Sequence, residues 1–401
     1  DFSGLTRENT FLGELPQHRA LGASANVWAG SSFGFDELFD DFSDISPDRR
    51  FSEGIDVARW GQQCDVTGIR QYLRFARSAI SHDHPIESLA NGALVQIDDW
   101  FSRLPVANPF DDGASIIARE MRSQITASPN PFFLFANFMD AHGPLSHVRS
   151  YDRSLHDAPL SWTSEDVDWR AVVASDNRTE LERYKGLYAA SIDYLDRQVC
   201  TFVDWLEENM DEETTVVVTS DHGDEMGADV DNSRWGHVES SLSESLLHVP
   251  LLVLNAPEGW KTVDTSQYVS HTDLGTLLVG LANGEVHDVT TGSIAAERIG
   301  HSGSLATIDD HRGTAADRMI RVVYEEQSKY IEDSRGTRSV HRLDESRACW
   351  EEHTECEFDT ALFDTFFDSD LSEYKQRTST EAGMSDVDES TRDRLEDLGY
   401  V

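Results

Sequence analysis

The sequence predicts an α/β fold with a mostly parallel central sheet flanked by helices, followed by a small C-terminal antiparallel α+β subdomain. Up to about residue 285, short apolar runs typical of buried strands alternate with longer amphipathic segments, which is the pattern of an α/β layer fold. Beyond that point, short strands follow one another without long helices between them. We therefore expect an α/β domain over 1–285 and a subdomain over 286–401.

The first part of the chain contains two predicted strands and one predicted helix. The small residues of 20–26 indicate a strand. Asp111 and Asp112 can cap a helix that runs to about residue 126, because carboxylates accept hydrogen bonds from the free N–H groups at a helix start. The apolar run 132–138 indicates a strand buried on both faces.

The most regular element comes next. Apolar residues recur three and four positions apart over 178–208, which indicates a long amphipathic helix. The β-branched run 214–219 predicts a strand, since consecutive branched side chains disfavour a helix. We expect a further buried strand at 249–254 and a helix at 273–281.

Short strands are predicted in the subdomain at 319–324, 329–332 and 338–342. The Asp-Ser-Arg-Gly sequence at 333–336 is typical of a turn that links two of them into a hairpin. The acidic, Ser/Thr-rich stretch 378–390 is expected to be a mobile tail.

Acidic residues dominate the composition: 74 Asp and Glu against 33 Lys and Arg give a formal net charge of -41 at pH 7. Such a surface repels nucleic acid and anionic lipid, and the longest apolar runs are too short to span a bilayer. We therefore expect neither a nucleic-acid nor a membrane partner. The Asp-rich, Lys-poor balance resembles proteins of salt-loving cells, where salt screens like charges, and an ordinary acidic protein is the alternative.

The four cysteines form neither a disulfide scaffold nor a Cys-x-x-Cys pair. We interpret them as free thiols, and their small number makes the cytoplasm the default location. The chain starts at Asp1 without a methionine or a basic, apolar leader, so we expect that a segment was removed or that the sequence is a fragment.

Two adjacent residues after the strand at 214–219 are suited to bind a metal ion. Asp221 and His222 stand where open α/β sheets place their ligands, at the carboxyl ends of the strands. A carboxylate oxygen beside an imidazole nitrogen suits manganese, zinc, or a calcium site that tolerates nitrogen. A tight turn would explain the Asp and Gly of this Asp-His-Gly sequence equally well.

Two further histidines extend the candidate site. His142 follows the strand at 132–138. If that strand and the one at 214–219 are parallel in one sheet, His142 and Asp221 open onto the same sheet edge. His237, on a polar loop, is a third candidate.

The ordered set of these segments resembles the sulfatases, a branch of the alkaline phosphatase superfamily. Residues 133–144 resemble their substrate-histidine segment, 215–225 their metal-binding strand and turn, and 236–253 the block that contains His-Val-Pro-Leu. The segment 188–196 matches the long helix before the metal-binding strand. The resemblance covers about residues 1–285.

The resemblance implies a role for each candidate residue. Asp221 and His222 would bind one divalent metal ion, Ca²⁺ by family precedent, with Mg²⁺ or Mn²⁺ as alternatives. His142 would hydrogen-bond the ester oxygens or the leaving group, and His237 would face the sulfate, so both are expected to be catalytic and substrate-binding residues. Asn26 stands where many members carry a Lys and a His for substrate, and it can donate a hydrogen bond but supplies no charge.

The nucleophile motif of the family is missing from this sequence. Members begin with a strand that ends in paired aspartates, followed by Cys- or Ser-x-Pro-x-Arg, and neither occurs here. The sequence Ser46-Pro47-Asp48-Arg49 is one residue too short. We expect the missing part to lie upstream of Asp1, the two remaining ligands to bind metal weakly, and the chain as given to be inactive.

Three functions remain open at this stage. The first is a sulfatase that hydrolyses a small-molecule or glycan sulfate ester. The second is a phosphodiesterase or another phosphoryl-transfer enzyme of the same superfamily. A sulfate monoester carries one negative charge and a phosphate monoester two, so the weakly cationic His142 and His237 favour sulfate. The third is a non-catalytic protein that binds sulfated glycans, against which the net charge argues.

Overall fold

The structure is a computed structural model that describes residues 4–46, 49–64, 66–102, 104, 106–128, 131–167, 172, 178–210, 213–227, 234–237, 241–262, 267–300, 318–344 and 351–381. The chain divides into two compact units. Unit 1 contains the described residues of 4–167 and 178–210, and unit 2 contains Val172 and those of 213–381. The domain boundary expected near residue 285 lies within unit 2 and stays a prediction.

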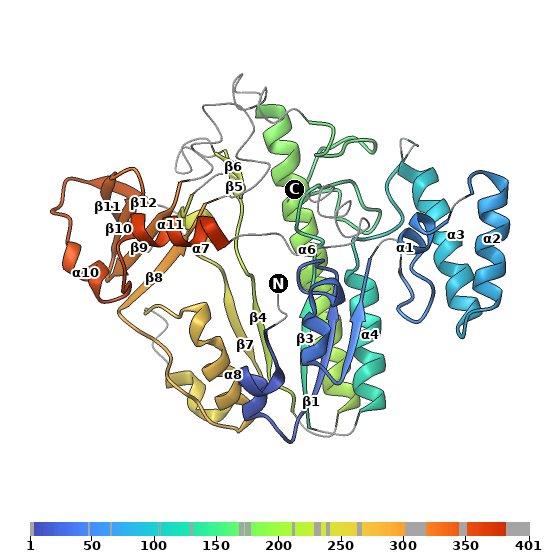
Figure 1. Cartoon of the computed structure of the whole chain (residues 1–401), viewed down its shortest axis with the longest axis horizontal. Helices are drawn as coiled ribbons and strands as arrows, with labels where there is room; N and C mark the ends of the chain where they lie inside the picture. Colours follow the sequence, from blue (N-terminus) through green and yellow to red (C-terminus); the bar gives the residue numbers. More distant parts are fainter. Residues whose placement is uncertain are drawn as a thin grey trace. The chain divides into compact units, whose positions relative to one another are not determined.

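Unit 1 is built on a parallel sheet with the strand order β2-β1-β3 (Figure 1). Its strands are β1 (Arg19–Ser24), β2 (Asp41–Asp44) and β3 (Phe132–Asn137). A Cβ atom on Gly22 would lie 2.4 Å from the Phe42 ring, so glycine allows the central strand β1 to approach β2 closely. The predicted parallel sheet is confirmed. The side chains of β3 are only half-buried, so the prediction of burial on both faces is wrong; among the described residues β1 is the one strand that pairs with β3.

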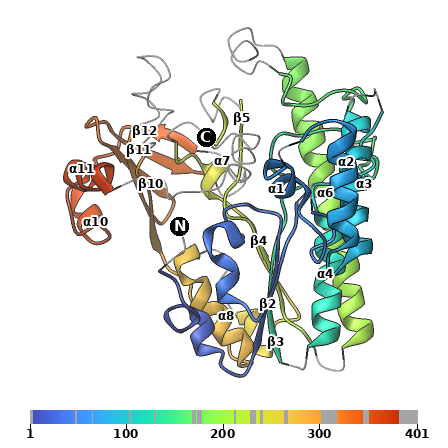
Figure 2. The same cartoon turned by 45° about the vertical axis from the view of Figure 1, so that its right-hand side comes forward.

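Two helices cover this sheet in layers (Figure 2). Helix α4 (Ala114–Ala127) packs on β1 and β3, and α6 (Arg178–Asn209) packs on α4. The long helix predicted over 178–208 is confirmed. It buries apolar side chains at helical spacing: Leu181, Tyr184, Leu187, Tyr194, Phe202 and Leu206.

The α-helices between β2 and α4 were not predicted from the sequence, whereas a short helical segment was expected after residue 10. Three α-helices lie between β2 and α4: α1 (Val57–Gln62), α2 (Ile69–Ile80) and α3 (Pro85–Ser102). Asn91 of α3 ties this group to the preceding loop by accepting from the Phe51 N–H and donating to the Phe51 carbonyl. Four 3-10 helices complete the unit: η1 (Arg7–Asn9), η2 (Phe11–Glu14), η3 (Ser31–Phe33) and η4 (Phe35–Leu38).

Unit 2 begins with an antiparallel ladder of β4 (Val216–Thr219) and β7 (Leu251–Leu254). Both strands were predicted, but β7 alternates half-buried and exposed residues, and Leu252 is 49% exposed. The prediction of a buried strand at 249–254 is therefore wrong, because β4 is the ladder partner of β7 and no further strand of the described residues pairs with it.

Shorter elements surround this ladder. A small hairpin of β5 (Glu225–Met226) and β6 (Trp235–Gly236) follows β4, and α7 (Glu244–Leu247) precedes β7. After β7 come η6 (Glu258–Thr262), η7 (His271–Asp273) and the predicted helix α8 (Leu274–Ala282).

The second part of unit 2 is an antiparallel sheet with the order β12-β11-β10-β9-β8, which confirms the predicted C-terminal subdomain. Its strands are β8 (Ser293–Arg298), β9 (Ile320–Glu325), β10 (Ser328–Asp333), β11 (Arg338–Leu343) and β12 (Glu351–Thr354). The predicted turn joins β10 to β11, because Asp333 Oδ1 accepts the N–H groups of Arg335 and Thr337, both at 2.9 Å.

A buried ionic cluster joins this sheet to α7. Lys329 of β10 is fully buried, and its Nζ donates to Glu244 Oε1 (2.9 Å), Glu351 Oε2 (2.7 Å) and the Leu242 carbonyl (2.6 Å). The Tyr324 hydroxyl donates to the same Glu244 oxygen, at 2.5 Å. The sheet is thus fixed to the segment that follows the loop of His237.

Helices α10 (Thr360–Asp364) and α11 (Leu371–Glu381) end the described chain. Most of the tail expected to be mobile, 378–390, lies outside the described residues, and its first four residues are helical. Within the described residues, no helix is long and apolar enough to cross a membrane. Cys64, Cys200 and Cys356 are free thiols, as predicted, and Cys349 lies outside the described residues.

Candidate functional site

The loop after β4 carries the predicted metal-binding pair. Gly223 allows this loop to lie against α7, because a Cβ atom there would come within 2.1 Å of the Ser245 carbonyl oxygen. The Gly223 N–H donates to the Leu246 carbonyl at 2.9 Å. The backbone around Asp221 and His222 is therefore held between β4 and α7.

The hydrogen bonds of His222 determine which nitrogen is available to a ligand. Its Nδ1 lies 2.8 Å from the Gly223 carbonyl oxygen, which can only accept, so Nδ1 carries the proton. In the neutral ring, Nε2 then keeps its lone pair, which is the arrangement of a metal-binding histidine. Asp221 is exposed, and its Oδ1 accepts the His222 N–H at 3.0 Å.

His237 lies beside His222 in the same unit. The two imidazole centroids are 4.5 Å apart with the ring planes inclined by 44°. His237 Nδ1 lies 3.1 Å from Asp224 Oδ1, and the carboxylate fixes the proton on this nitrogen. The structure therefore brings together three of the predicted residues, Asp221, His222 and His237, and adds Asp224 as the partner of His237.

Buried groups hold the loops that carry these histidines. Glu225 is fully buried, and its Oε1 accepts from Arg234 Nε (2.8 Å) and from the Ser241 hydroxyl (2.7 Å). Arg298 of β8 donates to the His237 carbonyl at 3.0 Å, and burial lowers the pKa of this arginine. The C-terminal sheet thus supports the position of His237.

The donor chemistry of this site fits a divalent cation. Asp221 supplies a carboxylate and His222 an imidazole nitrogen whose tautomer is set by Gly223. Within the described residues, no group of three or more His, Cys, Asp or Glu side chains is arranged to hold a metal ion. Since hard cations take about six donors, the pair would form only part of a coordination shell.

The other two predicted residues lie in unit 1. His142 Nδ1 donates to the Gly143 carbonyl, so Nδ1 carries the proton when this ring is neutral. Asn26 Oδ1 accepts the Trp28 N–H at 2.9 Å, which leaves the amide nitrogen as the donor that the sequence suggested. That both residues share a site with Asp221 stays a prediction, since they belong to a different unit.

Asp140, two residues before His142, has a structural role instead. It is fully buried, and its carboxyl accepts the N–H groups of Ala114 (3.1 Å) and Asp112 (3.2 Å) at the start of α4. Burial, together with the nearby carboxylate of Asp111, raises its pKa to about 8. Asp111 caps α4 as predicted, by accepting the Ser115 N–H at 2.8 Å, whereas the second cap is Asp140 and not Asp112.

Two contributors were missed by the sequence analysis. Asp224 was visible as the residue after Asp-His-Gly, but nothing in the sequence links it to His237, thirteen positions later. Asp140 lies in the motif around His142, and the sequence does not show whether it caps a helix or binds a metal ion. Its burial in the structure identifies it as a helix cap.

Comparisons with known proteins agree with this architecture. A sulfatase family model matches residues 98–284. An uncharacterized sulfatase of Escherichia coli K12, YidJ, is 31% identical over 106 residues, which are 26% of this chain and 20% of the relative. The matched part thus spans about a fifth of that relative's length.

Among solved structures, the phosphonate monoester hydrolase of Agrobacterium radiobacter aligns with a TM-score of 0.51 at 14% identity, over 83% of this chain and 73% of that one. A 2-O GAG sulfatase aligns with a TM-score of 0.39 at 18% identity, over 59% and 60% of the two chains. The first of these alignments supports the α/β fold.

Proposed function

We propose, from the match of residues 98–284 to a sulfatase family model, that this chain is a metal-dependent hydrolase of sulfate esters. The substrate would be a small-molecule or glycan sulfate ester, and the cation Ca²⁺, with Mg²⁺ or Mn²⁺ as alternatives. The observation that carries the proposal is the pairing of an exposed Asp221 with His222, whose Nε2 keeps its lone pair.

Each residue has a separate task in this proposal. Asp221 and His222 would hold the cation, which when bound would supply positive charge to the ester oxygens. His237, held by Asp224 at 3.1 Å, would present its Nε2 side to the sulfate group. When protonated, that nitrogen donates a hydrogen bond and adds a positive charge, both of which favour an anionic ester.

His142 would act on the leaving group. Its Nδ1 is held by the Gly143 carbonyl, so a protonated ring carries its transferable proton on Nε2. Delivery of that proton to the departing alcohol oxygen is general acid catalysis. Asn26 would add a neutral hydrogen-bond donor from its amide nitrogen.

The proposal assigns the nucleophile to none of the 401 residues, because the sequence contains no Cys- or Ser-x-Pro-x-Arg motif. The chain by itself should therefore bind a cation and a sulfate ester without turning the ester over. Hydrolysis of an aryl sulfate by the purified chain, at a rate that Asp221→Ala abolishes, would contradict this part of the proposal.

The binding part is tested by calorimetry on the whole chain. Titration with Ca²⁺, Mg²⁺ or Mn²⁺ should give one site, which Asp221→Asn and His222→Gln weaken. Asp83→Asn, which removes an equally exposed carboxylate elsewhere, should leave the affinity unchanged. Equal cation affinity in all four proteins would refute the assignment of the metal pair.

Competition between ligands separates the remaining functions. With the cation bound, an aryl sulfate should bind more tightly than a phosphate diester of the same aryl group. The reverse order would favour a phosphodiesterase. Tight binding of a sulfated oligosaccharide that Asp221→Asn does not affect would favour a non-catalytic glycan-binding protein.

A further inference from the structure

Helices α2 and α3 expose an apolar surface that nothing in the described structure covers. They lie side by side as a helical hairpin in unit 1 (Figure 1). Of the 17 large hydrophobic residues that are exposed in the described chain, ten lie between positions 69 and 106. Contiguous exposed apolar patches of this kind mark interaction surfaces in soluble proteins.

The exposed residues form one stripe on each helix. On α2 they are Ile69, Tyr72, Leu73 and Ile80, which are 55–79% exposed. Positions 69, 73, 76 and 80 are spaced alternately by four and three, so they lie on one face, and this is the spacing of a seam that packs against another helix.

The stripe continues on α3. Ile86, Leu89, Ile97 and Trp100 are exposed there, the last by 68%. Positions 86, 89, 93, 97 and 100 are spaced by three, four, four and three residues, so they also lie on one face of the helix. The hairpin therefore offers two parallel seams, as half of a four-helix bundle does.

The charges beside the two seams have opposite signs. Helix α2 carries Arg70, Arg74 and Arg77 and no acidic residue, in a chain with a net charge of -41. Helix α3 carries acidic residues, including Glu87 and Asp98, and no basic one. Arg70 and Arg77 form no ion pair with another described residue.

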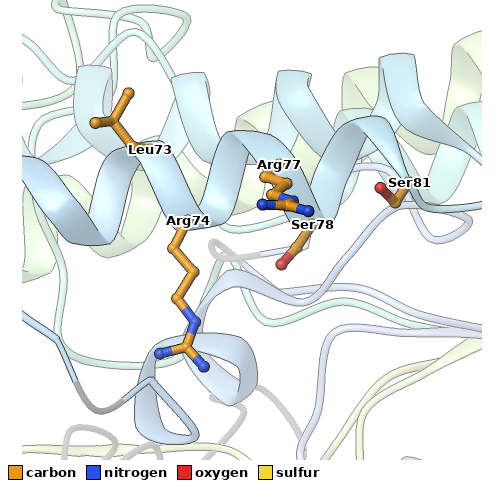
Figure 3. Close-up of a pocket in the computed structure, with 5 residues that line it drawn as sticks. All are labelled: Leu73, Arg74, Arg77, Ser78 and Ser81. Carbon is orange, nitrogen blue, oxygen red and sulfur yellow. The ribbon is translucent and has the colours of Figure 1, made fainter.

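Arg70, Arg77 and Glu87 lie on the outer flanks of the hairpin. Phe75 faces α3, since a Cβ atom on Gly92 would lie 2.2 Å from its ring, and helical spacing puts Arg70 and Arg77 on the side of α2 away from Phe75. By the same spacing, Glu87 lies on the side of α3 away from Gly92, whereas Asp98 has a buried carboxylate oxygen. Figure 3 shows the residues that line a surface hollow along α2, which are Leu73, Arg74, Arg77, Ser78 and Ser81, with Leu73 and Arg74 pointing to opposite sides of the helix.

We propose that the α2–α3 hairpin docks on the same hairpin of a second copy of this chain, so that the protein forms a two-fold symmetric dimer through a four-helix interface. A two-fold axis parallel to the helices places α2 of one copy opposite α3 of the other. The apolar seams then meet, and the arginine flank of each α2 lies against the acidic flank of the other α3.

The exposed area matches such an interface. The eight seam side chains present on the order of 800 Å² per copy, if a fully exposed large side chain presents roughly 150–200 Å². A standard stable interface buries about 800 Å² on each partner. A lipid surface suits this hairpin less well, because the acidic flank of α3 would have to lie against the bilayer beside the apolar seam.

Sedimentation velocity on the whole chain in about 1 M KCl tests the proposal, since salt at this concentration screens the net charge. We expect a dimer, and we expect Leu73→Glu to weaken it at least tenfold, with Ile69→Glu as a second variant should the first not fold. Leu155→Glu is the matched control, because Leu155 is 42% exposed in the same unit but lies outside the hairpin. It should leave the dimer intact.

A charge exchange tests the predicted pairing of helices. The variant Arg70→Glu with Arg77→Glu and the variant Glu87→Arg should each dimerise less well, and an equimolar mixture of the two should recover the dimer. A wild-type chain that stays monomeric at about 100 µM would overturn the proposal. A dimer indifferent to Leu73→Glu, or a monomer that binds phosphatidylcholine vesicles through this hairpin, would do so as well.

Discussion

Two short motifs of this chain look alike in sequence and differ in what their aspartates do. The segments Asp140-Ala141-His142-Gly143 and Asp221-His222-Gly223 each follow a strand, and in each the histidine donates from Nδ1 to the carbonyl of the next glycine. Asp140, however, is fully buried under the start of α4, whereas Asp221 is exposed.

The role of a carboxylate near a candidate site therefore depends on its burial and its hydrogen bonds, and the sequence motif alone does not identify that role. Asp140 accepts hydrogen bonds from two backbone N–H groups at the start of α4 in unit 1, so this residue stabilises the start of that helix. Among the described residues, Asp221 accepts a hydrogen bond only from the neighbouring His222 N–H, so its other oxygen can bind a cation. Substitutions at the two positions should therefore change different quantities.

The largest effect on stability is expected in unit 2, where the buried charge is Lys329 and not Asp221. Lys329→Met would leave Glu244 and Glu351 buried without their cation, at a cost of about 3–5 kcal/mol in the free energy of unfolding. Chemical denaturation followed by fluorescence measures this loss. Lys185→Met, on the surface of α6, is the control and should change stability by less than about 0.5 kcal/mol.

Asp140→Ala should come next, with a loss of about 2–4 kcal/mol, because it leaves one buried and one partly buried N–H group at the start of α4 without their acceptor. Asp221→Ala, the corresponding change in the other motif, should cost less than about 0.5 kcal/mol. The comparison between the motifs breaks down if the two alanine variants lose similar stability in denaturant titrations.

Cation affinity should respond in the opposite way. Asp221→Asn removes a charged ligand and should weaken divalent cation binding by about 10- to 100-fold, or about 1.4–2.8 kcal/mol. Asp140→Asn should leave the affinity unchanged, since its carboxyl is engaged by α4. Isothermal titration of both variants provides the measurement, and equal losses would show that the two aspartates are not separated in function.

The last expected effect is a pH dependence of stability that comes from Asp140. Its pKa is raised to about 8 in the folded chain, so the protonated form is favoured by folding. The stability it contributes is present at low pH and is lost as pH rises from about 4 to about 8. Asp140→Asn has no such titration, so its stability relative to the unsubstituted chain should improve over this range. A constant difference between pH 5 and pH 8 would count against this assignment.

The sequence predicted the elements whose patterns are long or unbroken. The helix at 178–208 was predicted from apolar residues at helical spacing, and the strand at 214–219 from consecutive β-branched residues, which disfavour a helix. Helices α2 and α3 were not predicted, although their apolar residues recur at helical spacing. In the structure these apolar residues are exposed, so the pattern does not mark a face that packs on the core of unit 1.

The candidate site was predictable only in part, for a similar reason. Asp221, His222 and His237 could be chosen from their types and their positions after strands. The link between Asp224 and His237 depends on the β5–β6 hairpin, which brings together residues thirteen positions apart. No local pattern records such a contact, and the burial that separates Asp140 from Asp221 is equally invisible in the sequence.

The most direct test of the central claim is anomalous diffraction from crystals of this chain grown with Mn²⁺. The account predicts one anomalous peak about 2.0–2.3 Å from both a carboxylate oxygen of Asp221 and Nε2 of His222, and its loss in Asp221→Asn. Manganese bound elsewhere, with Asp221 and His222 free of metal, would contradict it.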